Sequence, residues 1–380
     1  MYKDTVEYIR KIYKTDDFLP LHEPRFIGNE QQYAANTITS TFVSSVGEYV
    51  TQFENMVAEF VGAKYAIATS NGTSALHIAL KLVGVDENTE VITQPLTFIA
   101  TANAISYCGA KPIFIDVDRD TLGLSPIKLK EFLEENTFQD KEHNCINKST
   151  NKIIKACVPM HTFGHPCKID EIVNICNKYN IEVVEDSAES LGSYYKGKHT
   201  GTFGKVGIFS FNGNKIITTG GGGMIVTDDE ALAKRAKHIT TTAKVPHPYE
   251  YIHDKIGYNY RLTNLAAALG VAQMESLPFF IEKQQELASK YQAFFKQSKI
   301  ELILEPKDAK SNYWLNAIVL ENKEQRDEFL KYTNDNGIMT RPIWRLMNRL
   351  EMFKYAQCGD LSNANWLEDR VVNISSSVVV

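Results

Sequence analysis

Short hydrophobic runs alternate with longer amphipathic segments along most of the chain. The runs are typical of buried β-strands, and the segments between them have the spacing of helices that cover a sheet. Strands are predicted at residues 65–69, 90–93, 112–117, 153–158 and 181–186. Helices are predicted at residues 74–83, 97–108 and 169–179. This alternation predicts an α/β fold with a large, mostly parallel sheet.

The pattern changes near Leu269, which divides the predicted architecture. Before this point, the hydrophilic residues 134–152 are expected to form a surface insertion between a helix and a strand. After it, the sequence predicts helices at residues 278–297 and 324–336 and strand-like runs at residues 300–303 and 313–320. We therefore expect an N-terminal arm and a large α/β domain in residues 1–268, and a small C-terminal α+β domain in residues 269–380.

The composition excludes several classes of protein. With 380 residues, 43% hydrophobic and 23% charged, the chain is typical of a globular protein. A net charge of −5 gives no electrostatic reason to expect nucleic acid or an anionic membrane as a partner. The N-terminus is too charged for a signal peptide, and no apolar run approaches the ~18 residues of a membrane-spanning helix. The six cysteines form no CxxC pairs, which argues against a zinc site or a disulfide framework and favours a cytoplasmic location.

Lys215 lies in the most informative segment of the chain. It follows Ser210 and precedes a run of glycines at residues 220–223. A lysine amine can carry an aldehyde as a Schiff base, a serine hydroxyl can bind a phosphate, and glycines let the backbone approach a ligand closely. The segment is therefore a candidate cofactor site. The alternative is a surface lysine beside a loop, and other segments decide between the two.

Two further segments follow predicted strands, where α/β folds bind their ligands. Residues 70–76, Ser-Asn-Gly-Thr-Ser-Ala-Leu, open a helix and form either a phosphate site or an ordinary N-cap. In residues 185–189, Glu-Asp-Ser-Ala-Glu, Asp186 is either a partner for a protonated pyridine nitrogen or a helix N-cap. Both segments lie where a cofactor site would need them.

One aromatic and two imidazole side chains are weaker candidates for contacts with a cofactor or a metal ion. Phe98 opens another helix and either lies against an aromatic cofactor or belongs to the core. His161 and His165 flank Gly164 at a further turn. Since no other metal ligands cluster near them in the sequence, we expect no metal site.

The order of these features along the chain resembles the fold-type I pyridoxal-phosphate enzymes. The chain is more closely similar to the DegT/DnrJ/EryC1/StrS family of nucleotide-sugar aminotransferases, from about Pro20 to the C-terminus. The most specific parts of the resemblance are residues 70–76, 97–100, 185–192, 210–223 and 257–261. It implies an aspartate aminotransferase-like fold, pyridoxal 5′-phosphate (PLP) as cofactor, and a homodimer with active sites at its interface.

The resemblance also implies roles for individual residues. Lys215 would be the catalytic lysine that forms the Schiff base with the cofactor. Asp186 would bind the pyridine nitrogen, Glu189 would lie near the phenolic oxygen, and Phe98 would stack on the ring. The cofactor phosphate would be held by Thr73, Ser74 and Ser210, and Asn259 would reach the phosphate of the partner subunit's cofactor.

Three positions refine this resemblance. Many relatives have histidine where Asn212 stands and an acidic residue where Gly221 stands, so local loop contacts and substrate fit are less defined here. A small branch of the family has histidine in place of the Schiff-base lysine and acts as a sugar dehydratase. Lys215 therefore groups this chain with the transaminases.

The N-terminal loops bear on the substrate. Residues 20–30 and 42–47 resemble the subgroup that acts on UDP-linked 4-keto-6-deoxy-N-acetylhexosamines, on routes to bacillosamine or legionaminic-acid-type sugars. The implied reaction moves an amino group from L-glutamate to C4 of the keto sugar in two half reactions. Arg25, Arg261 and Arg341 are candidates to face the nucleotide pyrophosphate, or else surface and structural salt-bridge residues.

Two other functions stay open at this point. The first is a PLP aminotransferase for a different acceptor, such as a 3-keto sugar or a cyclitol ketone. The second is a non-catalytic protein that binds PLP or a nucleotide sugar. The presence of Lys215, Asp186 and Ser210 together argues against the second.

Overall fold

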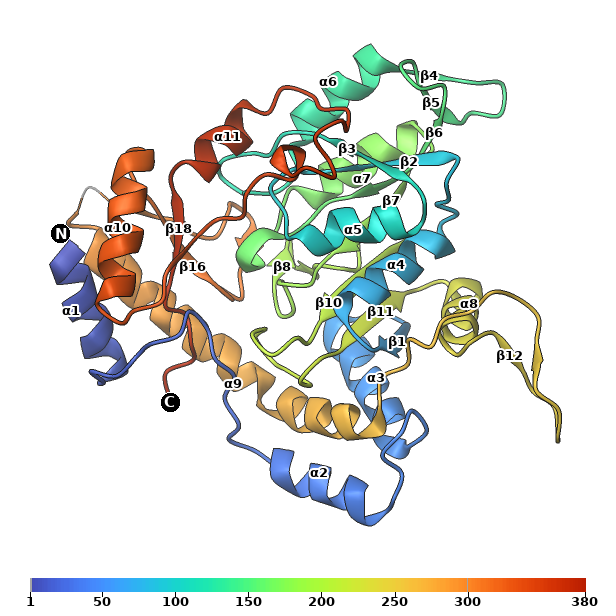
Figure 1. Ribbon diagram of the computed structural model, residues 1–380, viewed down its shortest axis with the longest axis horizontal. Coiled ribbons are helices and arrows are strands. Elements are labelled where there is room, and N and C mark those ends of the chain that lie inside the picture. Colours follow the sequence, from blue (N-terminus) through green and yellow to red (C-terminus); the bar gives the residue numbers. More distant parts are fainter. Residues whose placement is uncertain (1, 299) are drawn as a thin grey trace.

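The computed structural model describes residues 2–298 and 300–380 and contains one large mixed sheet (Figure 1). The strand β11 pairs antiparallel with both of its neighbours, whereas the other neighbouring strands of the main series pair in parallel. This confirms the predicted α/β fold with a mostly parallel sheet. In sheet order the strands are β1 (Tyr65–Thr69), β11 (Gly223–Thr227), β10 (Val206–Ser210), β7 (Glu182–Asp186), β6 (Ile153–Val158), β2 (Thr89–Thr93) and β3 (Lys111–Phe114).

Helices cover both faces of this sheet because successive strand residues point to opposite sides. Val184 and Ile208 pack in one hydrophobic cluster, whereas Val183 and Phe209, their sequence neighbours, pack in two other clusters. The first cluster includes residues of α4 (Gly72–Leu82), α5 (Ile99–Tyr107) and α8 (Glu230–Thr240). The opposite face is covered by α3 (Glu48–Val61), α6 (Pro126–Asn136), α7 (Ile169–Lys178) and α9 (Asn264–Phe295).

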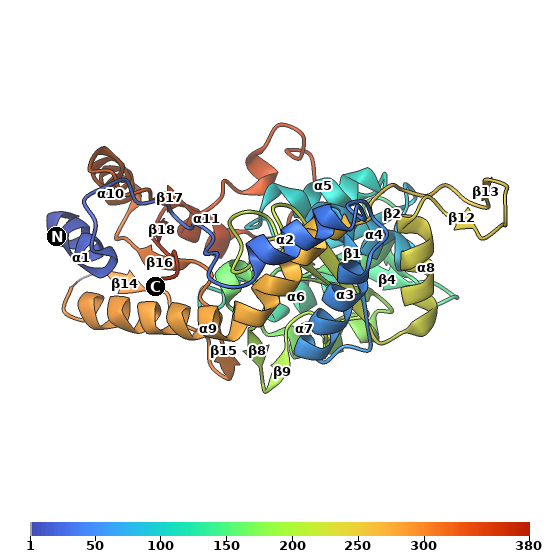
Figure 2. The ribbon, with the colours of Figure 1, turned by 90° about the horizontal axis from the view of Figure 1, so that it is seen from below.

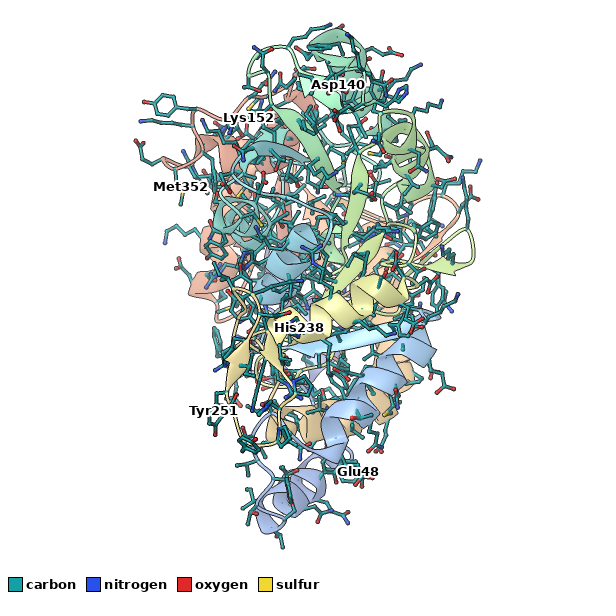
Figure 3. All side chains as sticks on the ribbon, turned by 90° about the vertical axis from the view of Figure 1, so that its right-hand side faces the viewer. Glu48, Asp140, Lys152, His238, Tyr251 and Met352 are labelled. Atoms are coloured by element: carbon teal, nitrogen blue, oxygen red, sulfur yellow. The ribbon has the colours of Figure 1, made fainter. Side chains whose placement is uncertain are left out.

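Residues 134–152 are more ordered than the sequence predicted. They contain a hairpin of β4 (Thr137–Gln139) and β5 (Cys145–Asn147), which joins the edge of β6. Asn147 is fully buried, and its amide donates to Glu90 Oε2 at 2.7 Å. Most of the segment is exposed or half-buried and lies between α6 and β6, as expected of a surface insertion, but the strand pairing and the buried Asn147 also attach it to the sheet. Asp140, at the hairpin tip, and Glu48, at the start of α3, lie at opposite ends of the molecule (Figure 3).

Helix α9 begins earlier than the sequence predicted. It starts at Asn264, where the Thr263 hydroxyl accepts from Ala266 N–H, and it continues through Pro278. The expected start at residue 278 was wrong because proline removes only its own N–H from the helix, while Leu277 and Phe280 on either side are buried and hold the helix in place. The helix is continuous across residues 268 and 269, and the division into two domains stays a prediction.

The C-terminal region forms a second, antiparallel sheet at one end of the molecule (Figure 2). The side chains of this sheet pack in a hydrophobic cluster that also includes Val6 and Ile9 of helix α1 (Tyr2–Tyr13). The predicted division assigns α1 to the first 268 residues. The cluster therefore unites the two ends of the chain. The elements of this region are β14 (Glu301–Leu302), β16 (Asn316–Val319), β17 (Arg341–Pro342), β18 (Val371–Ile374), α10 (Lys323–Asp335) and α11 (Ser362–Glu368).

Short elements complete the fold. The hairpin of β12 (Lys244–Val245) and β13 (Ile252–His253) projects from the end opposite the C-terminal sheet (Figure 2). Among the described residues, no helix is both long and apolar enough to cross a membrane. The remaining elements are α2 (Glu30–Thr39), β8 (Tyr194–Tyr195), β9 (Lys198–His199), β15 (Ala309–Lys310) and the 3₁₀ turns η1 (Thr162–Gly164) and η2 (Met347–Arg349).

We expect the Pro278→Ala substitution to raise the free energy of unfolding by about 2–2.5 kcal/mol. Proline costs ~3 kcal/mol relative to alanine inside a helix, and the greater freedom of an unfolded chain with alanine offsets ~0.4–1 kcal/mol of that gain. Pro278 is exposed, so no packing is lost. Urea unfolding measures the difference, with Glu282→Ala on the exposed side of the same helix as the control. A loss of stability in Pro278→Ala would contradict this account of α9.

Candidate active site

The N-terminus of α4 forms one wall of the candidate site. Asn71 caps the helix by accepting from Ser74 N–H at 2.7 Å. A Cβ on the next residue, Gly72, would come within 2.8 Å of the Cβ of Ser210 at the end of β10, so glycine is required for this approach. Gly72, Thr73 and Ser210 line the same cavity. A helix N-terminus with two hydroxyl groups beside it favours the binding of a phosphate.

Asp186 ends the central strand β7 and is buried. Its Oδ2 accepts from the Thr101 hydroxyl at 2.7 Å, and its Oδ1 accepts from Ala188 N–H at 3.2 Å. Burial raises the pKa of this carboxyl group, while the Thr101 hydroxyl, Ala188 N–H and the nearby Lys215 oppose that effect. The arrangement supplies a carboxylate at the end of the sheet that can accept from a protonated ring nitrogen.

Lys215 reaches the cavity from the turn after β10. Its Nζ lies 3.2 Å from Oε1 of Glu189 and 3.7 Å from the ring centroid of Trp314. The Trp314 indole in turn donates to the carbonyl of Asn214 at 2.6 Å, which fixes the turn that carries the lysine. A carboxyl group and an aromatic face thus hold the amine in the cavity.

Glu189 is the second buried carboxyl group of the site. Its Oε2 accepts from Phe163 N–H at 2.9 Å, and burial raises its pKa to about 7 against the opposing effect of Lys215. A carboxyl group with this pKa changes its charge near neutral pH. Glu189 can therefore either accept a hydrogen bond or donate one within the cavity.

These groups meet in one cavity of about 640 Å³. Phe98, half exposed at the start of α5, and Arg341, in β17, also line it. Seven of the lining residues were predicted from the sequence as site residues: Thr73, Phe98, Asp186, Glu189, Ser210, Lys215 and Arg341. Their convergence from separate segments is what a cofactor and substrate site requires, and their individual roles remain predictions.

Four other predicted site residues lie outside the lining of this cavity. The Ser74 hydroxyl donates to Asn71 O at 2.8 Å within the helix cap. Arg25 pairs with Glu23 and donates to Val378 O at 2.9 Å. Arg261 lines a separate surface hollow beside β12, and Asn259 is exposed on the segment after β13. Their predicted binding roles stay predictions.

Sequence reasoning missed several cavity residues. Trp314 and Asn214 are the clearest cases, since they contact each other across 100 positions of sequence. Trp314 lies in a run that was interpreted only as a strand, and Trp344 and Arg345 beside Arg341 also line the cavity. A tryptophan and two arginines in residues 341–345 were a usable signal, because aromatic and guanidinium groups recur at ligand sites.

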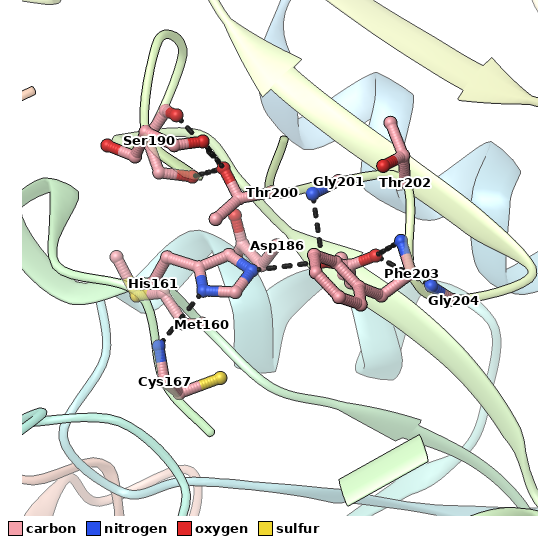
Figure 4. A network of polar contacts seen from close by, with 12 residues as sticks. Met160, His161, Cys167, Asp186, Ser190, Thr200, Gly201, Thr202, Phe203 and Gly204 are labelled. Atoms are coloured by element: carbon pink, nitrogen blue, oxygen red, sulfur yellow. Dashed lines mark hydrogen bonds and ion pairs between the residues drawn. The ribbon is translucent and has the colours of Figure 1, made fainter. Parts of the chain in front are cut away.

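His161 belongs to a buried hydrogen-bond network beneath the site (Figure 4). Its Nδ1 accepts from Cys167 N–H at 3.2 Å, so Nε2 carries the hydrogen and donates to Glu185 at 3.1 Å. Glu185 also accepts from the N–H groups of Gly201 and Gly204, at 2.8 and 2.6 Å. This network holds the turn that leads into β10. In the described part of the chain, no three histidine, cysteine, aspartate or glutamate side chains are grouped to hold a metal ion.

Comparisons with known proteins agree with this geometry. The sequence model of the DegT/DnrJ/EryC1/StrS aminotransferase family matches residues 25–379. GDP-perosamine synthase of Escherichia coli O157:H7 is 39% identical over 94% of this chain and 93% of its own length. EpsN of Bacillus subtilis (strain 168), provisionally named a pyridoxal phosphate-dependent aminotransferase, is 40% identical over 88% of this chain and 83% of its own length. The crystal structure of the aminotransferase TlmJ from Streptoalloteichus hindustanus superposes with a TM-score of 0.85 at 25% identity, covering 94% of this chain and 93% of TlmJ.

We expect Glu189→Gln to remove a pH dependence of stability from the cofactor-free protein. The carboxyl group has a pKa of about 7 when folded and a reference value of 4.5, so the folded state keeps a proton that the unfolded chain releases. Stability from this group is complete below pH ~4.5 and is lost as the pH rises through 7. The difference corresponds to about 3 kcal/mol.

Urea unfolding at pH 5 and pH 8 measures this effect. The wild-type protein should lose about 2.5 kcal/mol more than Glu189→Gln between the two pH values, because part of the effect is already lost at pH 5. Glu87→Gln, at an exposed carboxylate, is the control and should keep the wild-type pH dependence. Equal pH dependence in wild type and Glu189→Gln would contradict the assignment.

Proposed function

The chain belongs to the DegT/DnrJ/EryC1/StrS aminotransferase family, and we propose that it transfers an amino group from L-glutamate to the keto carbon of a nucleotide-linked sugar. The observation that carries this proposal is the shared cavity of Lys215, Asp186 and Ser210. An amine, a buried carboxylate and a phosphate-binding hydroxyl come together there from three strand ends and turns. A protein that only bound a nucleotide sugar would not need the amine beside the two buried carboxyl groups.

The residues of the cavity fit PLP, the cofactor of this family. The N-terminus of α4, Thr73 and Ser210 would hold its phosphate, and glycine at residue 72 leaves the room this requires. Asp186 would accept from the ring nitrogen, and Phe98 would lie against the ring. When bound, the cofactor supplies an electron sink for the amino-group transfer. Lys215 would be the residue that binds it covalently.

The chain's own residues account for proton movement in this reaction. Lys215, when its amine is free, can carry a proton between the substrate carbon and the cofactor. Glu189, 3.2 Å from Nζ, keeps the amine in the cavity. Trp314 covers the amine and excludes water from its other side. These contacts position the lysine for repeated proton transfer.

We infer that the acceptor is a 4-keto-6-deoxy sugar, for which two nucleotide classes compete. The N-terminal loops favour a UDP-linked N-acetylhexosamine, of the kind used for surface-glycan sugars such as bacillosamine or legionaminic acid, and Leu21 of these loops lines the cavity. GDP-perosamine synthase as a relative at 39% identity favours a GDP-linked sugar instead. Arg341, at the cavity, would face the nucleotide phosphates in either case.

A homodimer in the cytoplasm is part of the proposal. Asn259 is exposed and lies outside the cavity of its own chain, as expected if it reaches the cofactor phosphate of the partner subunit. Arg25 and Arg261 also lie outside this cavity. They would bind substrate only if the cavity of the partner subunit lies next to them. A monomer would be expected to lack part of the phosphate site.

Lys215→Ala should abolish amino transfer, with a loss of at least ~10³-fold in kcat, because both the covalent attachment of PLP and the proton carrier are removed. Absorbance of the reconstituted protein should lose the band of covalently bound PLP, while circular dichroism stays that of the wild type. Lys205→Ala, which removes a surface lysine paired with Asp229, is the matched control and should retain activity. Full activity in Lys215→Ala would refute the lysine assignment.

The acceptor is tested by supplying L-glutamate with one keto sugar at a time. We expect 2-oxoglutarate and a nucleotide-linked 4-amino sugar, detected by mass spectrometry, with either the UDP-linked or the GDP-linked 4-keto-6-deoxy sugar. Preference for one nucleotide should reach at least about tenfold in kcat/KM, equivalent to one lost hydrogen bond. Turnover only with a 3-keto sugar or a cyclitol ketone would overturn the proposed acceptor and retain the aminotransferase.

A further inference from the structure

Thr101 makes a direct contact with the buried carboxylate of the site. It lies in the first turn of α5, and its hydroxyl donates to Asp186 Oδ2 at 2.7 Å. Only 1% of Thr101 is exposed, so water does not compete for this hydrogen bond. A short hydrogen bond to an ionised acceptor in a buried position is among the stronger kinds in proteins.

A second threonine fixes the direction of this hydrogen bond. The Thr97 hydroxyl lies 2.8 Å from the Thr101 hydroxyl and is itself fully buried. An ionised carboxylate only accepts, so Thr101 must give its single hydrogen to Asp186 and can only accept from Thr97. Two other acceptors lie near the Thr97 hydroxyl, Phe98 O at 3.4 Å and Met160 Sδ at 2.9 Å, but the first is distant and a sulfur atom is a weak acceptor compared with a hydroxyl oxygen. The two threonines therefore form a chain of donors that points at Asp186.

Several charged and titratable groups surround Asp186, and the Thr101 hydroxyl acts on the carboxylate together with them. Lys215 lies near enough to favour the ionised carboxylate, Glu189 is the carboxyl group that opposes it, and His161 lies nearby as a neutral imidazole whose Nδ1 accepts from Cys167 N–H. Ala188 N–H donates at 3.2 Å, a longer contact than that of Thr101. Thr101 is thus the closest hydrogen-bond donor that the described residues offer to Asp186.

We propose that Thr101 is a positioning residue that keeps the shared proton on the ring nitrogen of the cofactor by stabilising Asp186 as an acceptor. The inference rests on the proposed role of Asp186 toward PLP. One proton lies between the ring nitrogen and the carboxylate, and no other group gains or loses one. Removal of the Thr101 donor makes the carboxylate the better base, so the proton moves from the ring nitrogen to Asp186 and the ring loses its positive charge.

The holoenzyme reconstituted with PLP that carries ¹⁵N in its ring tests this inference without reference to activity. The ¹⁵N chemical shift reports whether the ring nitrogen is protonated. We expect a protonated nitrogen in the wild type and an unprotonated one in Asp186→Asn, which serves as the reference. Thr101→Val should move the shift toward the Asp186→Asn value, by about a tenfold change in the proton equilibrium.

Two controls separate this effect from a general loss of packing. Thr101→Ser keeps the hydroxyl and should restore the wild-type ¹⁵N shift. Thr240→Val removes an equally buried helix hydroxyl, which donates to Ala236 O at 2.7 Å and does not line the cavity, and should leave the shift unchanged. A wild-type shift in folded, PLP-bound Thr101→Val would overturn the inference.

Two other outcomes have a defined meaning. If Thr101→Val does not fold or does not bind PLP, Thr101→Ala carries the test, because it removes the same donor to Asp186 without placing a second methyl group against the carboxylate. A partial shift toward the Asp186→Asn value supports the inference, and a wild-type shift overturns it. Failure of the wild type to bind PLP at all would instead refute the proposed function on which the inference rests.

Discussion

Two carboxyl groups, Asp186 and Glu189, are buried side by side after the central strand, and the rest of the site is arranged around them. Removing an ion from water costs several kcal/mol unless hydrogen bonds and opposite charges compensate. The compensating groups come from three separate segments: Thr101 in α5, Phe163 N–H in η1 and Lys215 after β10. Each of these segments must reach the end of β7 for the carboxylates to be tolerated. Burial of the charge therefore defines which elements meet there.

The second constraint is that the start of α4 lies very close to two strands, and glycine at two positions leaves room for this close contact. Gly72 lets the start of α4 approach Ser210, and a Cβ on Gly223 would come within 2.4 Å of Asn71 O. The same end of α4 thus contacts both β10 and β11. Gly221, where many relatives carry an acidic residue, has only Ser70 O near it, at 4.0 Å. A larger side chain has room there, so this difference from the family changes the surface of the loop and not its packing.

Local patterns in the sequence predicted the parts of the site that depend on neighbouring residues. Asp186 could be placed because it ends a hydrophobic strand, and Thr73 because it lies in the first turn of a helix. Contacts across long stretches of sequence could not be predicted in this way. Trp314 reaches Lys215 only after the C-terminal region has folded back, and its segment alone has the pattern of a strand. The continuity of α9 through Pro278 was missed for the same reason, since buried neighbours outweigh the local preference of proline.

The cavity is lined by residues at the end of the large sheet and by residues of the C-terminal segment 341–345, and the two groups are held in place differently. Asp186, Ser210 and Lys215 come from the ends of the large sheet, whereas Trp344 and Arg345 come from the segment after β17. Sheet-end residues are fixed by strand pairing on both sides, as in β10 between β7 and β11. The backbone of Arg341 pairs with Asn373 of β18, but the side chains of Arg341 and Arg345 are exposed and lie outside the large sheet. Substitutions in residues 341–345 can therefore change the shape and charge of this wall of the cavity without moving the lysine.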